Sequence, residues 1–366
     1  MATGYTTYTW FENSVIFIGN LMIEKNNKKI LVIMTGGTIC SSVNDKNERF
    51  SDARNVRIIN EFKNSGSEFS WVEFESVAAL DILSENMTID TWNVLLDAFR
   101  KVEWQKYCGV IVLHGTDTLA YTASLLSLVL CGCGVPVMCV SAQLPLWESG
   151  TNGHDNFRMA AELIMKGIAP NVYAVYRNCD GNIYVHYGAH LLQCKNYSND
   201  FSSFDMMTAD EAISRAQGFK TDGMLIGSFE RLMPCVMYIS PYVGLDYSAL
   251  CLDGVRAVVH ATYHSNTVCV DRTGGEGGIT DFSALSLLKR CRVHSIPFIL
   301  APCDGNAYAY ESTGDALRNG AGYASGVTLE TAYVKALVGC ALGFDGEKLC
   351  KFMNSDVNGE NICGKI

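Results

Sequence analysis

The sequence predicts an α/β protein with a larger N-terminal domain, built on a mostly parallel, doubly wound sheet, and a smaller C-terminal α/β domain. Three observations predict this class. Short apolar runs alternate with helical patterns, several of these runs end in small or polar residues, and 366 residues are enough to build two cores. Because strands and helices alternate, the strands are expected to lie parallel, with helices covering both faces of the sheet.

The strands predicted for the N-terminal part are apolar runs, and a helix is expected between two of them. The runs are Ile30–Met34, Gly109–Leu113, Val135–Val140 and Val172–Val175. The stretch Leu119–Leu130 has the pattern of a helix, and the threonine and aspartate residues before it are suited to cap its first turn.

A second series of strands and helices follows a polar, glycine-containing stretch from Phe204 to about Leu232. Its predicted strands are Cys235–Ile239, Val255–Ala261 and Pro297–Ala301. Its predicted helices lie around Tyr247–Leu252, Phe282–Cys291, Ala316–Arg318 and Leu329–Leu342. We therefore expect an N-terminal extension over residues 1–28, a first domain over 29–210, a linker over 211–233 and a second domain over 234–366.

Composition argues against several classes of function. The formal net charge is −10 and the chain has no lysine- and arginine-rich run, so we expect no nucleic-acid partner and favour a small-molecule substrate. The 15 cysteines are odd in number, form no Cys-x-x-Cys pair and accompany no His-Glu-x-x-His motif. We interpret them as free thiols of a cytoplasmic protein, and we expect no metal ion, organic cofactor or disulfide framework.

The beginning of the chain does not have the pattern of a targeting signal. Residues 1–21 contain a short apolar run, Ser14–Ile18, but no basic residue and no clear cleavage site. We therefore expect an appendage rather than a secretory signal. No apolar stretch is long and isolated enough to cross a bilayer, so no membrane association is expected.

Two clusters of glycine and threonine follow predicted strands. They are Thr35-Gly36-Gly37-Thr38 and His114-Gly115-Thr116-Asp117-Thr118. Ligands of parallel sheets bind at the carboxyl ends of the strands, so these clusters are the leading candidates for a site. The glycines permit close approach of the backbone to a ligand, and a threonine hydroxyl is a potential nucleophile. Each cluster alone is equally compatible with a tight turn and helix-capping residues.

Together, the two clusters resemble the paired signatures of the bacterial-type L-asparaginase/glutaminase family, and the chain looks most similar to its cytosolic (type I) subgroup. The second signature fits throughout Gly109–Leu119, and the first departs only at Cys40, where the family usually has a smaller residue. Later segments extend the resemblance almost to the end of the chain. They are Ala301–Cys303, Tyr310–Ser312 and Ser325–Ala332.

The resemblance implies a catalytic role for four residues. It makes Thr38 the nucleophile, Thr116 and Asp117 members of a proton relay, and Lys195 the relay lysine, because Lys195 precedes Phe201 by the six residues typical of the family. A solvated loop charge is the other interpretation of Lys195. We expect the Lys195 amine to lie within hydrogen-bond reach of Thr116 or Asp117, since proton transfer needs direct or one-water contact.

The resemblance also implies residues that bind substrate. Gly37 and Gly115 are placed to border the ligand, and Ser84 matches the serine that holds the substrate's α-carboxylate. Glu85 departs from the family, and it is either a ligand for the α-ammonium group or an exposed acid near a helix start. Asn152 stands where the family commonly has aspartate, which leaves its role open.

The family's lid tyrosine has no counterpart here. Residues 41–51 include Phe50 but no aromatic hydroxyl, so either another group activates Thr38 or the lid is not catalytic. Tyr263 and His264 resemble a loop that faces the site in cytosolic enzymes, and either of them could come from a neighbouring subunit. They are equally compatible with partly buried residues at a strand end. The resemblance predicts a homodimer or homotetramer.

The function implied is that of an L-asparaginase, which hydrolyses L-asparagine to L-aspartate and ammonia through a threonine acyl-enzyme and a Thr–Asp–Lys relay. Lysine acts as a base only when its amine is deprotonated, which burial promotes. One alternative is a glutaminase or another small-amide hydrolase, including the asparaginase-like subunit of a tRNA-dependent amidotransferase. The other is a catalytically inactive binding or sensor protein.

Overall fold

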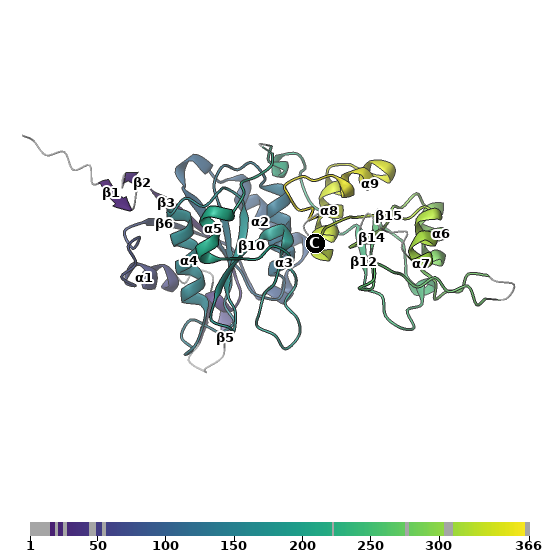
Figure 1. Ribbon diagram of the computed structural model, residues 1–366, viewed down its shortest axis with the longest axis horizontal. Coiled ribbons are helices and arrows are strands. Elements are labelled where there is room, and N and C mark those ends of the chain that lie inside the picture. The colour runs from purple at the N-terminus through teal and green to yellow at the C-terminus, as the bar shows by residue number, and fades with distance from the viewer. Residues whose placement is uncertain are drawn as a thin grey trace, which may run out of the picture.

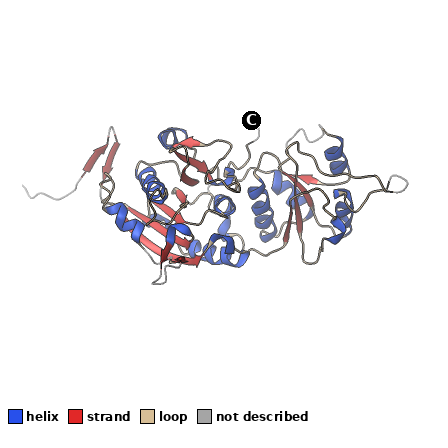
Figure 2. Ribbon diagram, turned by 90° about the horizontal axis from the view of Figure 1, so that it is seen from below, coloured by secondary structure: helices blue, strands red, loops and turns tan. Residues whose placement is uncertain are grey.

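The computed structural model describes residues 15–18, 21–24, 28–43, 49–52, 56–221, 223–274, 278–303 and 310–362. These residues form a seven-stranded and a four-stranded sheet, each flanked by helices, and two short hairpins (Figures 1 and 2). The α/β class with a larger mostly parallel sheet and a smaller second one is confirmed.

The larger sheet has the strand order β11-β10-β9-β8-β7-β3-β6. Five neighbouring strands, from β9 through β8, β7 and β3 to β6, run parallel, and β10 and β11 are antiparallel to their neighbours. The strands are β3 (Lys29–Gly36), β6 (Glu73–Ile82), β7 (Gly109–Leu113), β8 (Val137–Val140), β9 (Val172–Arg177), β10 (Ile183–Tyr187) and β11 (Met207–Thr208).

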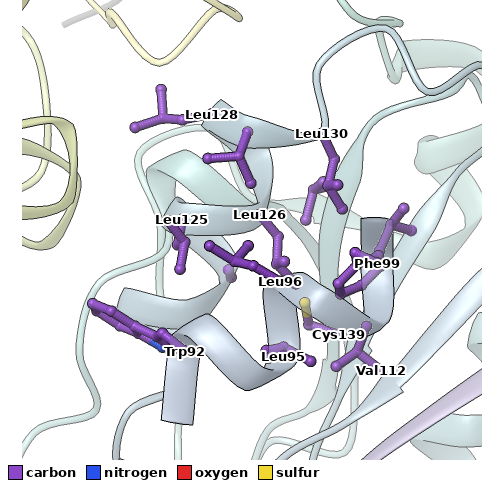
Figure 3. Close-up of a cluster of buried hydrophobic side chains, with 14 of the residues drawn as sticks. Trp92, Leu95, Leu96, Phe99, Val112, Leu125, Leu126, Leu128, Leu130 and Cys139 are labelled. Carbon is purple, nitrogen blue, oxygen red and sulfur yellow. The ribbon is translucent and has the colours of Figure 1, made fainter. Parts of the chain in front are cut away.

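Helices cover both faces of this sheet. They are α1 (Arg57–Lys63), α2 (Ile89–Arg100), α3 (Leu119–Val129), α4 (Gly153–Met165) and α5 (Ala209–Arg215). Side chains alternate along a strand, so Ile30 and Val32 of β3 pack in the cluster with α1 and α4, whereas Leu31 packs in the cluster with α2 and α3. Figure 3 shows the second cluster, in which Leu96 of α2 lies beside Leu126 of α3. Burying each such side chain contributes roughly 1.5–3 kcal/mol.

The smaller sheet is entirely parallel, in the order β12-β13-β14-β15. Its strands are β12 (Val236–Ile239), β13 (Ala257–Ala261), β14 (Phe298–Ala301) and β15 (Gly322–Tyr323). Its helices are α6 (Ala284–Val293), α7 (Glu311–Arg318), α8 (Leu329–Ala341) and α9 (Gly346–Asn354).

Helix α8 joins the two sheets. Val334 and Leu337 pack in the core of the larger sheet with α3, while Ala332 and Ala336 pack in the core of the smaller one. Figure 1 places α8 between the two sheets accordingly. Lys335 of α8 is completely buried and pairs with Glu360 at 2.6 Å, while its amine also donates to the Ser355 carbonyl. The paired charge is what makes burial of this lysine tolerable.

Two hairpins lie at segments that the sequence left without secondary structure. Within the expected extension, β1 (Val15–Ile18) pairs with β2 (Leu21–Glu24), and most of the remaining extension falls outside the described residues. In the segment that lacks the lid tyrosine, β4 (Ser41–Val43) pairs with β5 (Arg49–Ser51). The Phe50 side chain is not described.

Other differences concern weakly patterned segments. The helix expected around Tyr247–Leu252 is only a 3₁₀ turn over Tyr247–Ala249, started by the Asp246 side chain, which accepts from the Ser248 N–H at 2.8 Å. The edge strands β6 and β11, and β10 beside β11, were not predicted. Among the described helices, none combines the length and apolar character needed to cross a membrane.

Three buried histidines lie on or directly after strands, and burial lowers the pKa of each to about 4. His114 follows β7, His186 lies on β10 and His260 on β13. The ring nitrogen Nδ1 of His260 is 2.7 Å from the Ala261 carbonyl, and Nε2 is 2.7 Å from the Tyr247 hydroxyl. A carbonyl only accepts, so Nδ1 carries the proton and the neutral ring satisfies both partners.

We predict that the free energy of unfolding falls as the pH drops from about 6.5 towards 4. In this window the unfolded chain binds protons that the three folded-state rings do not, because their folded pKa is depressed, and full stability is reached above about 6.5. Each ring would contribute about 2 kcal/mol between pH 7 and pH 5. Urea unfolding at both pH values measures this.

His260→Gln should reduce the change in unfolding free energy between pH 7 and pH 5 by the contribution of one ring. His294→Gln, at an exposed position, is the control and should leave that change as in the wild type. A His260→Gln protein with the wild-type pH dependence would contradict the assignment.

Candidate active site

The candidate site lies where three neighbouring parallel strands end. Strand β3 lies between β6 and β7. Gly37 and Thr38 follow β3, and Ser84 follows β6. Thr116 and Asp117 follow β7. The chain leaves β3 for β6 on one side and then crosses by way of α2 to β7 on the other side. Such a reversal of strand order opens a crevice at the carboxyl ends of the strands, which is where ligands of this sheet type bind.

Hydrogen bonds to the backbone hold the three segments together. The Gly37 N–H donates to the Ile82 carbonyl at the end of β6 at 2.8 Å. The Thr35 hydroxyl, which is buried, donates to the Leu113 carbonyl at the end of β7 at 2.9 Å. The two bonds fix the turn after β3 against both of its neighbours.

Glycine is required at positions 37 and 115, where the turn after β3 meets the turn after β7. A Cβ on Gly37 would lie 2.5 Å from the Cα of Gly115, and Gly37 has φ of 76°, which side chains rarely adopt. A Cβ on Gly115 would lie 2.4 Å from the Ser84 hydroxyl. The two glycines therefore let the three segments meet at van der Waals distance.

Ser84 and Asp117 form the most strongly connected pair of the site. The Ser84 hydroxyl donates to Oδ2 of Asp117 at 3.0 Å and accepts from the Asp117 N–H at 3.2 Å. The Thr118 hydroxyl donates to the Ser84 carbonyl at 2.9 Å. Ser84 is buried while Asp117 is exposed, so the carboxylate faces solvent from a fixed position at the mouth of α3.

Thr38 and Thr116 are partly buried, and each follows one of the two contacting glycines. Within the part of the chain that the structure describes, neither hydroxyl has a hydrogen-bond partner, and neither backbone N–H is used in a ladder or cap. Ser41 donates to the Thr38 carbonyl at 2.7 Å, which holds the 3₁₀ turn Thr38–Cys40. These groups are thus available to a ligand.

His114 lies beneath this arrangement and is completely buried. Its Nδ1 is 2.8 Å from the Gly115 carbonyl and donates to it, which leaves Nε2 as an acceptor without a partner among the described residues. Because burial lowers the pKa of His114 to about 4, the ring is neutral at pH 7. The ring therefore stabilises the turn at Gly115 through its hydrogen bond and brings no charge to the site.

Among the described residues, no hydrogen bond or ion pair joins Lys195 to the other predicted residues. Lys195 is exposed at the start of a turn in which its carbonyl accepts from the Ser198 N–H at 3.0 Å. Its amine has no hydrogen bond or ion pair with any described residue, Thr116 and Asp117 included. The expected contact is therefore not made in this structure, because the side chain extends into solvent; a role in the relay remains a prediction.

Gln193, which was not predicted from the sequence, is the residue of this segment that reaches Asp117. Its side-chain N–H donates to the Asp117 carbonyl, and its backbone N–H donates to Oε1 of Glu330 at 3.0 Å. Glu330 is 7% exposed, and burial raises its pKa. In the sequence, the only signal for this segment was the spacing between Lys195 and Phe201, and that spacing does not identify Gln193 as a contact of Asp117.

The remaining predicted residues lie as follows. Glu85 is exposed beside Ser84 in a 3₁₀ turn. Asn152 is buried, accepts from the Gln143 N–H at 2.9 Å and donates to the Arg177 carbonyl at 2.9 Å, so it joins the loop after β8 to the end of β9. Tyr263 and His264 are exposed after β13 in the smaller sheet.

A comparison with family models identifies the chain. The model described as "Asparaginase, N-terminal" matches residues 29–217, which is more than half of the chain. The chain belongs to the asparaginase family. The resemblance inferred from the paired glycine and threonine clusters is thereby confirmed.

Curated relatives of this asparaginase-family chain match shorter segments. A subunit of the glutamyl-tRNA(Gln) amidotransferase of Saccharolobus islandicus is 35% identical over 123 residues, which are 33% of this chain and 27% of the relative. The L-asparaginase of Thermococcus kodakarensis is 27% identical over 152 residues, which are 40% of this chain and 44% of the relative. The chain thus spans less than half of the length of each of these relatives.

Solved structures resemble nearly the whole chain. The thermostable L-asparaginase from Thermococcus kodakarensis has a TM-score of 0.75 at 22% identity and covers 91% of this chain and 99% of its own. L-asparaginase I from Vibrio cholerae has a TM-score of 0.65 at 21% identity and covers 92% of this chain and 99% of its own. These similarities show that the two-sheet fold is shared.

We predict that Gly37→Ala destabilises the asparaginase-family fold by about 2 kcal/mol or more, since the new Cβ overlaps the Gly115 backbone and the positive φ is strained. Gly66→Ala is the matched control, because Gly66 has φ of 75° but nothing within 4 Å of a built Cβ. The loss of unfolding free energy in Gly66→Ala measures the cost of an alanine at positive φ alone, about 1–2 kcal/mol. Equal losses for both variants in urea unfolding would contradict the close contact.

Proposed function

We propose that this protein is an L-asparaginase, which hydrolyses L-asparagine to L-aspartate and ammonia. The observation that carries the proposal is the meeting of the Thr38 turn, the Thr116–Asp117 turn and Ser84 at three neighbouring strand ends, in a chain of the asparaginase family. Family membership supports an amidohydrolase, and the choice of asparagine goes beyond it.

Substrate binding is assigned to Ser84, Asp117, Gly37 and Gly115. The Ser84 hydroxyl would bind the α-carboxylate of asparagine, and the solvent-facing Asp117 carboxylate would bind its α-ammonium group, aided by the exposed Glu85. In this structure Ser84 donates to Asp117, so the substrate exchanges one hydrogen bond for others. The two glycines keep the floor of the site free of side chains.

Thr38 is the proposed nucleophile. Its Oγ attacks the side-chain amide carbon, the C–N bond breaks, and ammonia leaves with the proton taken from the hydroxyl. Water then attacks the aspartyl ester and regenerates Thr38. The backbone N–H groups of Thr38 and Thr116, which are free within the described residues, are suited to bind the oxyanion, and each such donor typically lowers the barrier by about 3 kcal/mol.

The proposed relay passes a proton between Thr38, Thr116 and Lys195, with Asp117 orienting the amine. Lys195 reaches the relay only when its side chain turns from solvent towards Asp117, and we propose that substrate binding drives this rotation. The need for a base follows from the neutral hydroxyl of threonine, which is a weak nucleophile without one.

A glutaminase is the second candidate. The relatives named as glutamyl-tRNA(Gln) amidotransferase subunits are 35% identical over their matched segment, a higher identity than that of the matched L-asparaginase. Ammonia release from L-asparagine, L-glutamine and a β-aspartyl dipeptide separates the candidates. Release from none of them would instead favour an inactive binding protein.

A cytoplasmic location and a homodimer or homotetramer remain proposals. The cysteines among the described residues are all free thiols, which is compatible with a reducing compartment. A subunit boundary near the site would allow Tyr263 or His264 of a neighbouring copy to take the place of the lid tyrosine. Light scattering, which gives the mass of the assembly, addresses the oligomeric state.

We predict that Thr38→Ala abolishes ammonia release while the urea unfolding midpoint stays close to that of the wild type, since the change removes from a partly buried position only a methyl group and a hydroxyl that has no partner among the described residues. Thr38→Ser, which keeps the hydroxyl, should retain measurable turnover. Wild-type rates for Thr38→Ala would overturn the assignment of the nucleophile.

We also predict that Lys195→Met lowers kcat by about 100-fold or more, the range of general acid–base contributions. Lys166→Met, at another exposed lysine after α4, is the control and should leave kcat unchanged. A crystal structure with bound L-aspartate should show the Lys195 amine within hydrogen-bond reach of Thr116 or Asp117. An amine still in solvent in that complex would remove Lys195 from the relay.

A further inference from the structure

A chain of hydrogen bonds connects helix α8 with the mouth of helix α3. Glu330, in the first turn of α8, accepts from the Gln193 N–H at 3.0 Å, and the Gln193 side chain donates to the Asp117 carbonyl. Asp117 directly precedes Thr118, the N-cap residue of α3. These hydrogen bonds therefore connect α8, which packs on the smaller sheet, with the candidate site on the larger one.

We propose that Gln193 and Glu330 are positioning residues, which hold the segment that carries Lys195 against Asp117. The proposal rests on the function proposed above and adds two residues to it. Neither residue touches substrate; both act by placing the relay lysine. Gln193 is two residues before Lys195, so the two Cα atoms lie within about 7 Å of each other.

The geometry explains how Lys195 can serve the relay from its exposed position. With the Gln193 side chain held at the Asp117 carbonyl, the segment that carries Lys195 is attached beside Asp117. The proposal is that rotation of the flexible four-carbon side chain then brings the amine to the carboxylate. We call the contacts of Gln193 with Asp117 and Glu330 the clamp. Without the clamp, residues 193–200 would have to become ordered in every catalytic cycle, and the entropic cost would add to the barrier.

The clamp has a second, independent attachment on the same turn of α8. The Thr331 hydroxyl donates to the Ala189 carbonyl at 2.7 Å, and the Ser124 hydroxyl of α3 lies 2.9 Å from it. Thr331 and Ser124 are completely buried. The first turn of α8 thus holds residues 189–193 at two points and contacts α3 at the same time.

The Glu330 carboxylate gives this attachment its strength. Glu330 is almost fully buried, and a buried carboxylate is costly unless it accepts hydrogen bonds. Burial raises the pKa of Glu330, while hydrogen bonds from its own N–H and from Gln193 and Thr328 oppose that shift. A charged acceptor makes a stronger hydrogen bond with Gln193 than a neutral one would.

Gln193→Met is the main test, because it keeps the side-chain length and removes the donor to Asp117. Oε1 of Gln193 is buried without a partner among the described residues, so its loss should not weaken the fold. Glu330→Gln, which keeps the volume but neutralises the acceptor, is the second variant if Gln193→Met fails to fold. Asn199→Ala, at an exposed position of the same segment, is the matched control.

The measurements are steady-state ammonia release from L-asparagine and hydrogen exchange of residues 192–200 in the full chain. We expect Gln193→Met to lower kcat about tenfold or more with KM changed by less than about threefold, because a misplaced relay group affects the chemical step. Exchange of residues 192–200 should be faster in Gln193→Met, faster at Gln193 in Glu330→Gln, and unchanged in Asn199→Ala.

Two outcomes would overturn the clamp: exchange of residues 192–200 at the wild-type rate in both variants, or faster exchange with unchanged kcat. A wild-type protein that releases no ammonia from any of the amides would instead refute the proposed function. In that case hydrogen exchange alone decides whether Glu330 and Gln193 hold the segment.

Discussion

The contact between the backbones of Gly37 and Gly115 is the constraint on which the rest of the site depends. A Cβ on Gly37 would overlap the backbone of Gly115, and a Cβ on Gly115 would overlap the Ser84 side chain, so the three strand ends can meet only if both residues lack side chains. The meeting brings the turns of Thr38 and Thr116 together and sets Ser84 within hydrogen-bond distance of Asp117. Elements far from the site, such as the buried strands β3 and β7, serve to bring these turns to one edge.

The order of the strands converts this contact into a crevice. Because β3 lies between β6 and β7, the chain runs from β3 to β6 on one side and then crosses to β7 on the other, and this reversal of strand order opens a crevice at the strand ends. The apolar clusters on the two faces keep the strands rigid, since their residues are almost fully buried and close-packed. Rigid strands, together with the glycines that let the turns pack against each other, give the polar groups of the site fixed positions at little entropic cost.

Helix α8 makes the site depend on both parts of the chain. Its apolar residues belong to the cores of both sheets, and its first turn holds the segment 189–193 through Glu330 and Thr331. The candidate site is therefore built on the larger sheet but is supported from the smaller one. This dependence gives a physical reason for the two parts to share one chain, because movement of α8 would be transmitted to Asp117 through Gln193.

The sequence by itself determined the fold class, the central strands and the two motifs of the site. Strands buried on both faces, such as Gly109–Leu113, are unbroken apolar runs, and the motifs lie directly after them. The half-exposed edge strand β6 lacks such a run, and the 3₁₀ turn at Tyr247 depends on one local cap, so neither was predicted. Only the tertiary structure decided that Gln193 rather than Lys195 contacts Asp117, and that Glu330 holds Gln193. These contacts join residues 76 and 137 positions apart, and a pattern of neighbouring residues carries no information about which of several polar side chains a distant segment will meet.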